Sequence, residues 1–178
     1  MKIYAIAHPQ RGQIEYRDRK RYLWLGSLIY PVLSLSGIGL YLLTGREWTL
    51  VAPLAANYIV IPLVDWLVGE DPSNPPEELV PALEADPFYR WLPLLTVPMH
   101  FAVLIIVAAF AGTHALSIGG FLVLALTAGL YSGLGINTAH ELGHKKQSLE
   151  RWMSRIVLAV PAYGHFCVAH TRGHHRNV

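Results

Sequence analysis

Four long apolar runs constrain this chain more than any other feature of its sequence. They extend from Tyr22 to Thr44, Trp48 to Val68, Trp91 to Ala111 and Ala115 to Thr138. About twenty apolar residues are enough for a helix to cross a bilayer, and each run reaches that length. Of all residues, 53% are hydrophobic and only 15% are charged, fewer than in a typical soluble domain. The sequence therefore predicts an all-α, polytopic membrane helical bundle with four transmembrane helices.

A fifth apolar stretch, from Trp152 to Val168, is shorter and carries charge at its start. We expect a short helix there that either lies in the membrane interface or crosses fully, and that leads into a histidine cluster.

All but one of the 14 lysines and arginines fall in segments on one side of the predicted bundle, Arg46 being the exception. By the positive-inside rule, the N-terminus, the loop from Gly69 to Arg90 and both histidine clusters then face the cytoplasm.

Two histidine clusters follow the last long run. His140 and His144 are four residues apart, as are His170 and His174, and His175 follows directly. Residues four apart project from one face of a helix, so each pair can reach one cation. Five imidazoles exceed what one tetrahedral zinc ion uses. Nitrogen-rich ligand sets suit iron, copper, nickel or zinc, and spacing alone does not choose among them. The pattern predicts a metal centre, with ligands for two ions, at the cytoplasmic membrane face.

The first cluster also fits a second interpretation. The pattern His-Glu-x-x-His on a helix is typical of zinc peptidases, in which the glutamate, here Glu141, is the general base. A peptidase needs one zinc with three protein ligands, and the second cluster supplies more than that. A metal-transport protein is disfavoured, because its histidines would be distributed along the spans. The single Cys167 excludes an intrachain disulfide framework, and a dispersed net charge of +2 argues against nucleic acid as a partner.

Polar residues inside the predicted spans need a reason, since an unpaired polar group is costly in hydrocarbon. Asp65 either accepts a proton from a metal-bound imidazole, and so orients it, or pairs with a basic residue. His100 is expected to be an interior histidine rather than a ligand. For His165, five residues before His170, we expect a buried structural role or a contact behind the metal ligands.

Small residues line one face of the fourth run, at Ala125, Gly129 and Gly133, and the same face continues to Asn137. Such a stripe lets a neighbouring helix approach closely in a membrane. We expect it to hold the helix end that carries His140 tightly, which would preorganise the ligands.

The residues around both clusters resemble the first two histidine boxes of the membrane-bound alkane 1-monooxygenases, which are integral-membrane di-iron enzymes. The resemblance covers nearly the whole chain, because four further stretches are similar to the family pattern in the same order. Fatty-acyl desaturases and hydroxylases share the architecture. Their second box is typically His-x-x-His-His, in which the first two histidines are one residue closer together than His170 and His174 are here. The matching stretches are 137–146 and 170–176 for the two boxes, and 63–65, 69–76, 96–100 and 163–166 elsewhere.

This resemblance implies an O2-dependent monooxygenase that converts medium- or long-chain n-alkanes to primary alcohols at a non-haem di-iron centre. The chain would form part of a single hydroxylase domain that passes several times through the inner (cytoplasmic) membrane. Rubredoxin, reduced by its reductase, would supply the electrons. Two iron ions would be held by the histidines of both clusters, which are His140, His144, His170, His174 and His175.

The resemblance also gives roles to residues outside the ligand set. Residues behind the ligands would be Asp65, Glu141 and His165. Asn57 and Asn137 would line the substrate channel, while for Asn57 a polar contact to another helix is the second interpretation. Rubredoxin would dock on a basic patch, whose members otherwise serve as positive-inside anchors. That patch comprises Lys145, Lys146, Arg172 and Arg176.

Two departures from the family pattern matter. The family usually has a glutamate directly before the second box, where this chain has Ala169. The family also carries further histidine ligands, including a third box, in a C-terminal half, whereas this chain ends at Val178. Because five histidines do not complete two iron sites, we expect the sequence to be the N-terminal part of a longer enzyme and to be inactive alone.

Overall fold

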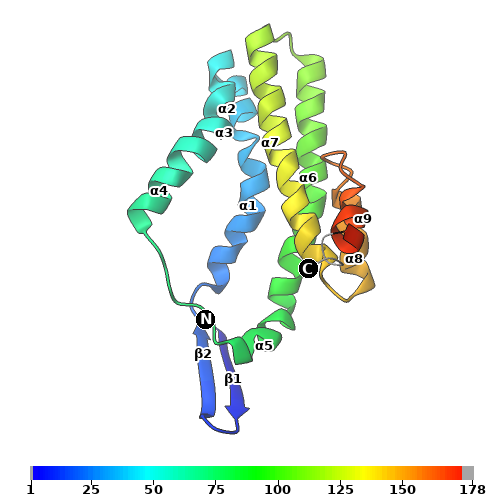
Figure 1. Cartoon of the computed structure of the whole chain (residues 1–178). Coiled ribbons are helices and arrows are strands. Elements are labelled where there is room, and N and C mark those ends of the chain that lie inside the picture. The colour runs from blue at the N-terminus through cyan, green and yellow to red at the C-terminus, as the bar shows by residue number, and fades with distance from the viewer. Residues whose placement is uncertain (1, 174–178) are drawn as a thin grey trace.

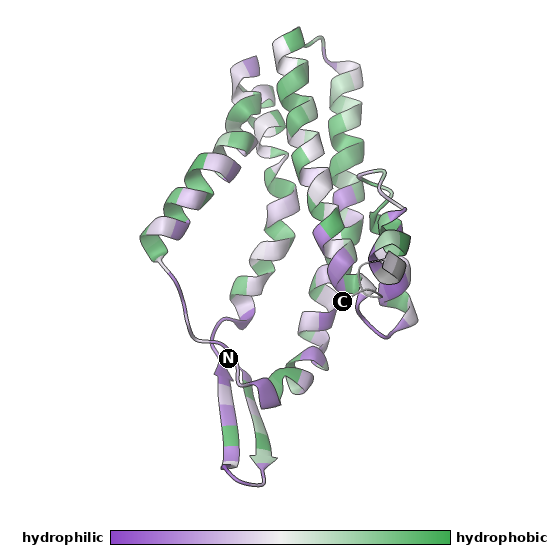
Figure 2. Ribbon diagram, viewed as in Figure 1, coloured by the Kyte–Doolittle hydropathy of each residue, from purple (hydrophilic) through white to green (hydrophobic). Residues whose placement is uncertain are grey.

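The computed structural model describes residues 2–173, and most of them are helical, as the predicted membrane bundle requires (Figure 1). Within these residues, three helices are long and apolar enough to cross a membrane: Glu47–Val68, Pro87–Thr113 and Ile118–Gly143. A fourth span exists only if the bent pair Arg21–Leu33 and Ser36–Thr44 is counted as one. Apolar residues dominate these helices, and polar residues gather on the hairpin and loops at one end of the bundle (Figure 2).

The first predicted span is two helices with a bend between them. The 3-10 helix η1 (Arg21–Leu25) leads into α1 (Gly26–Leu33), and α2 (Ser36–Thr44) follows at an angle of 54°. Pro31 lies within α1 and has no N–H to donate to the preceding turn. The Ser34 hydroxyl donates to the Pro31 carbonyl at 2.6 Å, which competes with the regular helical bonds. Proline and serine together account for the bend.

The second span changes helix type along its length. It consists of η2 (Glu47–Val51), α3 (Ala52–Ala55), the π-helical η3 (Ala56–Val60) and α4 (Ile61–Val68). Pro62 has no backbone N–H to donate to the preceding turn, and this missing hydrogen bond accounts for the π-helical turn just before it. Every residue of α4 is exposed, and the helix leans away from the rest of the bundle (Figure 1). A non-helical loop then leads to η4 (Glu77–Leu79) and α5 (Val80–Glu84).

Helices α6 (Pro87–Thr113) and α7 (Ile118–Gly143) form the long hairpin at the centre of the fold. Asp86 caps α6 by accepting from the Phe88 N–H, and Ser117 caps α7 by accepting from the Gly120 N–H. One buried cluster packs near the turn of this hairpin. A second cluster, called here the proximal core, packs near its open end and consists of Leu94, Val97, Ala139, Leu142, Val157 and Leu158.

The small-residue stripe does not pack as the sequence predicts. A side-chain carbon added at Gly129 or Gly133 would meet nothing within 4 Å among the described residues. The buried face of α7 is instead the neighbouring one, which includes Tyr131 and Gly135. At Gly135 an added carbon would lie 3.5 Å from a methyl group of Val157. The close approach that holds the end of α7 is therefore to the helix that follows it.

The sequence reading does not predict the β-hairpin that precedes the first helix. Strands β1 (Lys2–His8) and β2 (Gly12–Asp18) pair antiparallel, with Lys2 opposite Asp18 and His8 opposite Gly12. Gly12 has a φ of 72°, which a turn residue without a side chain adopts readily. The all-α class is therefore correct for the membrane bundle and wrong for this N-terminal segment.

The predicted helix 152–168 is a helical hairpin rather than one helix. α8 (Ser148–Val157) ends early, and α9 (Phe166–Val168) with the π-helical η5 (Ala169–Gly173) follows a turn. The backbone reverses where the Tyr163 N–H donates to the Leu158 carbonyl at 2.9 Å. Pro161 cannot continue the helical hydrogen bonding, and Ala162 adopts a positive φ of 55°. The stretch therefore folds back on itself instead of crossing the bilayer as one helix.

Candidate metal centre

The first histidine pair stands at the end of the last long helix. His140 lies in the final turn of α7, and His144 is the residue that caps its C-terminus. Their Nε2 atoms are 3.1 Å apart and their ring centroids 4.5 Å apart. The spacing of four residues thus brings both imidazoles to one point, as the sequence predicts.

The third imidazole comes from the second cluster. His170 lies on η5, and its Nε2 atom is 3.3 Å from that of His144. Its ring centroid is 4.6 Å from that of His140. Each of the three residues offers one nitrogen, and these atoms all lie within 4.8 Å of one another. Segments thirty residues apart therefore meet at one group of potential metal ligands.

The spacing of these nitrogens fits a shared cation. Imidazole nitrogens bind first-row metals at about 2.1 Å, so two ligands at 90–109° around one ion lie roughly 3.0–3.4 Å apart. The two measured separations, 3.1 and 3.3 Å, fall in that range. A neutral imidazole uses the lone pair of one nitrogen for the metal and keeps a proton on the other. Three Nε2 atoms turned towards one another are therefore a suitable donor set for one ion.

Glu141 lies beside the three imidazoles that could hold a metal. Its Oε1 atom is 3.5 Å from Nδ1 of His140, on the side of the ring away from the Nε2 group. A carboxylate in this place favours a proton on Nδ1 and leaves the Nε2 lone pair for a metal. The glutamate of a zinc peptidase has to face the metal-bound water instead. This contact fits a supporting role better than that of a general base.

Helix α8 holds the two ligand-bearing segments against each other. The buried Ser154 hydroxyl donates to the Ala139 carbonyl at 2.6 Å, directly before His140. The same hydroxyl lies 4.0 Å from Sγ of Cys167, three residues before His170. Phe166 and Cys167 also pack against the proximal core. One small side chain thus touches the segments of both clusters.

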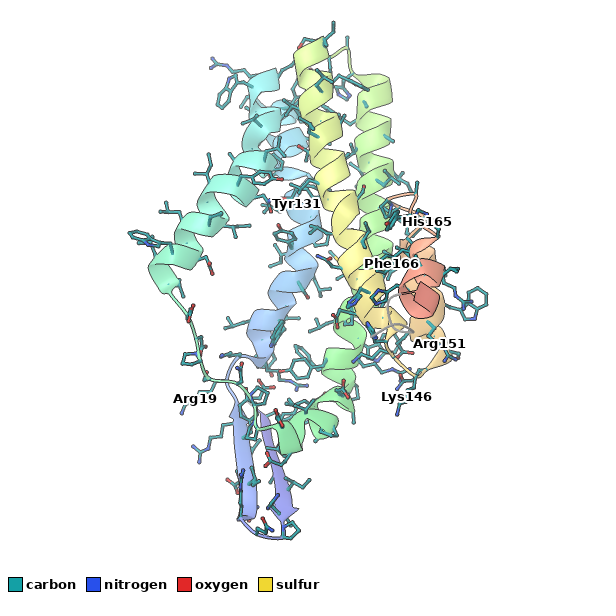
Figure 3. All side chains as sticks on the ribbon, in the orientation of Figure 1. Arg19, Tyr131, Lys146, Arg151, His165 and Phe166 are labelled. Atoms are coloured by element: carbon teal, nitrogen blue, oxygen red, sulfur yellow. The ribbon has the colours of Figure 1, made fainter. Side chains whose placement is uncertain are left out.

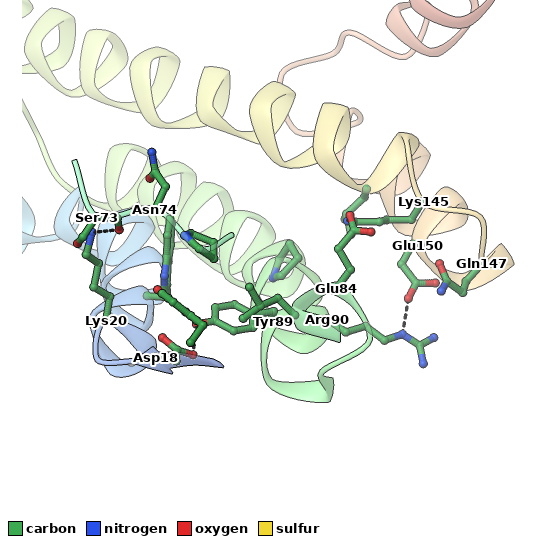
Figure 4. Close-up of a pocket in the computed structure, with 16 residues that line it drawn as sticks. Asp18, Lys20, Ser73, Asn74, Glu84, Tyr89, Arg90, Lys145, Gln147 and Glu150 are labelled. Atoms are coloured by element: carbon green, nitrogen blue, oxygen red, sulfur yellow. Dashed lines mark hydrogen bonds and ion pairs between the residues drawn. The ribbon is translucent and has the colours of Figure 1, made fainter. Parts of the chain in front are cut away.

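An ion pair fixes the start of α8. Nε of Arg90, on α6, is 2.5 Å from Oε1 of the buried Glu150. The Arg90 guanidinium lowers the pKa of Glu150, so the carboxylate stays charged at neutral pH. The pair borders a cavity of about 320 Å³, and a partly buried hydrogen bond from the Tyr89 hydroxyl to Asp18 lies on its other side (Figure 4). No local signal reveals this pair in the sequence, because sixty residues separate its members.

Other predicted site residues lie elsewhere. Asp65 is on the exposed α4, which Figure 1 shows across the bundle from α8 and α9, so the structure does not bring it to the histidines. His165 is exposed, which corrects the prediction that it is buried, and its ring packs edge-on against Tyr163 (Figure 3). His100 is buried in the bundle, as predicted for an interior histidine.

The two asparagines also differ from each other. Asn57 accepts a hydrogen bond from the Tyr30 hydroxyl, so it makes the contact between helices that was its second interpretation. Asn137 is exposed on α7.

Of the predicted docking residues, Lys145 lies 3.2 Å from Glu84, and Lys146 is exposed at the same end of the molecule as Arg151 (Figure 3). The roles predicted for His174, His175 and Arg176 fall outside the described residues, as does the side chain of Arg172.

Comparison with known proteins finds relatives that match the whole chain or nearly all of it. Residues 117–178 match the fatty acid desaturase family model. The chain is 48% identical over its whole length to alkane 1-monooxygenase 1 of Alcanivorax borkumensis, of which it covers 45%. It is 49% identical over 92% of its length to alkane 1-monooxygenase of Pseudomonas putida and to that of Ectopseudomonas oleovorans, covering 41% of each. The chain thus spans less than half the length of these relatives.

Proposed function

We propose that this chain, which is 48% identical over its whole length to one alkane 1-monooxygenase, belongs to that family and serves in the O2-dependent hydroxylation of n-alkanes at the terminal carbon. In this reaction one oxygen atom enters a C–H bond to give a primary alcohol. The other oxygen atom leaves as water, which consumes two electrons and two protons. The observation that supports the proposal most is the meeting of His140, His144 and His170 at the end of a membrane helix.

The three described imidazoles are the residues that would hold iron, through Nε2 of each ring. We add His174 and His175 on the sequence pattern, for a centre of two ions. Bound iron supplies the activation of dioxygen, which no amino-acid side chain provides. Glu141, whose Oε1 atom lies 3.5 Å from Nδ1 of His140, would support that imidazole from the side away from its Nε2 atom.

The membrane setting suits an alkane substrate. Each methylene that leaves water for an apolar phase gains about 0.8 kcal/mol, so alkanes concentrate in the bilayer. An apolar groove between α6 and α8 lies beside the proximal core, and Phe101 of α6 and Met153 of α8 contribute to both. We propose that the alkane reaches the site from the bilayer through such apolar surfaces. Asn57 and Asn137 are proposed to border its path.

Electrons are proposed to come from rubredoxin on the cytoplasmic side of the inner membrane. The charge distribution supports this orientation, because lysine and arginine are concentrated at the end that carries the histidines. The docking patch would consist of Lys145 and Lys146 with Arg172 and Arg176, and an acidic partner would be attracted to it. Docking there would bring the donor close to the metal ligands, since Lys145 directly follows His144.

The experiment that tests the function follows labelled oxygen. Membranes containing this sequence as part of a full-length enzyme are incubated with 18O2, an n-alkane, rubredoxin, its reductase and NADH, and the products are analysed by mass spectrometry. We expect primary alcohol with one 18O atom, and its loss in His144→Ala but not in His8→Ala, whose histidine lies on the distant β-hairpin. Metal analysis should find iron in excess of zinc. Absence of labelled alcohol, together with a zinc content near one per chain, would reject the proposal.

A further inference from the structure

We propose that Phe166 is a positioning residue that sets the orientation of the His170 imidazole in the metal centre. The inference rests on the proposed function, because it assigns His170 to the ligands. Phe166 precedes His170 by four residues, and their rings stack almost parallel, at 13° with centroids 4.9 Å apart. The ring of Phe166 also lies 6.4 Å from that of His140. The Phe166 ring therefore lies beside imidazoles from both clusters.

The place of Phe166 in the fold explains why it can act in this way. Its side chain packs against the proximal core, and its ring also stacks on that of His170. The segment that carries His170 is short, since α9 and η5 together run only from Phe166 to Gly173. A helix of that length has little stability of its own in water. The direction of the His170 ring thus depends on what the segment packs against.

Stacking constrains an imidazole in a way that an aliphatic contact does not. A flat ring over the face of His170 opposes rotation about the bond that carries the imidazole, because rotation would drive the two rings into each other. Metal-bound histidines are usually oriented by a hydrogen bond from their second ring N–H, and loss of that partner weakens metal binding or activity about 10- to 100-fold. Phe166 performs that task here with an aromatic face.

The test measures binding of Co(II), whose visible absorption reports the geometry of its ligands, to the purified protein in detergent. Phe166→Leu keeps an apolar side chain in the proximal core but removes the ring. We expect its Co(II) dissociation constant to rise by about tenfold or more, with altered absorption bands. Phe166→Tyr restores a ring and should bind Co(II) as the wild type does. Phe101→Leu is the matched control, because Phe101 packs against the same core from α6.

A double-variant cycle separates positioning from general packing. If Phe166 acts through His170, then Phe166→Leu should add no further loss of Co(II) affinity to His170→Ala. Equal losses in Phe166→Leu and Phe101→Leu, or unchanged affinity and spectrum in Phe166→Leu, would overturn the inference while leaving the proposed function intact. If the wild type and His144→Ala show the same weak Co(II) binding, the histidines do not form a metal centre, and both the proposed function and this inference are rejected. Should Phe166→Leu not fold, Phe166→Met gives the same comparison.

Discussion

The hydroxyl of Ser154 donates a hydrogen bond of 2.6 Å to the carbonyl of Ala139, the residue directly before His140. Both residues are buried, and the bond joins α8 to the last turn of α7. An added side-chain carbon on Gly143 would lie only 3.3 Å from the same hydroxyl oxygen. The end of α7 that carries the first ligand pair is thus fitted closely to α8.

Replacement of Ser154 should weaken both the fold and the metal site. Ser154→Ala removes the donor and leaves the Ala139 carbonyl without this bond, a loss of about 1 kcal/mol in the free energy of unfolding. Because the carbonyl belongs to the turn before His140, we also expect weaker Co(II) binding. Thermal unfolding in detergent and a Co(II) titration measure the two effects. Ser27→Ala is the control, since Ser27 donates a comparable bond to the Trp24 carbonyl far from the histidines; an equal loss of Co(II) affinity there would contradict the prediction.

Glu141→Gln separates the monooxygenase from the peptidase interpretation. The Oε1 atom of Glu141 approaches Nδ1 of His140 and not the Nε2 group, so an amide in its place should leave iron content close to that of the wild type. Alcohol formation should fall moderately, because the proton on Nδ1 is held less firmly. Iron content and product formation are measured in the same membranes. Peptide cleavage by the wild type that disappears in Glu141→Gln would instead favour the zinc enzyme.

The ion pair between Arg90 and Glu150 should matter more than the one between Lys145 and Glu84. Glu150 is almost fully buried, whereas Glu84 is largely exposed. Glu150→Gln should therefore lower the free energy of unfolding by about 2 kcal/mol, while Glu84→Gln should change it by less than about 1 kcal/mol. Thermal unfolding of both variants provides the comparison. Equal stabilities would show that the pair does not hold α8 in place.

Stability should fall in acid through Asp86. The Arg21 guanidinium, with Lys2 and the Tyr4 hydroxyl, holds the pKa of Asp86 well below its usual value near 3.8. A depressed pKa in the folded state means that the stabilisation is present above about pH 4 and is lost as the pH falls further. The melting temperature of the wild type should therefore drop more steeply below pH 4 than that of Asp86→Asn, which already lacks the charge. Parallel pH profiles of the two proteins would count against this assignment.

The sequence predicts those parts of this protein that depend on local patterns. Apolar runs of sufficient length indicate the membrane helices, and a spacing of four residues brings His140 and His144 together without any tertiary contact. The contribution of His170 was also predicted, from its spacing of four residues to His174 and from the resemblance of its segment to a histidine box. Its place depends on the reversal between Leu158 and Tyr163, and neither periodicity nor length reveals a turn inside an apolar stretch.

The errors have physical causes as well. The stripe at Gly129 and Gly133 is indistinguishable in sequence from a packed one, because only the position of the neighbouring helix decides which face is buried. The hairpin was missed because its alternation of polar and apolar residues is short and lies beside much stronger helical signals. Asp65 was assigned because it is a polar residue inside a predicted span, and His165 because it lies five residues before His170; neither observation carries information about distance in space.

The reversal that carries Phe166 and His170 back towards α7 has a consequence for how the protein matures. His140 and His144 can meet on α7 alone, but His170 arrives on a separate piece of backbone, so a newly inserted chain offers an ion only part of the ligand set until the two pieces have docked. Loading of the centre must then come late in biogenesis, after the hydrophobic seam around Leu142 and Val157 has closed.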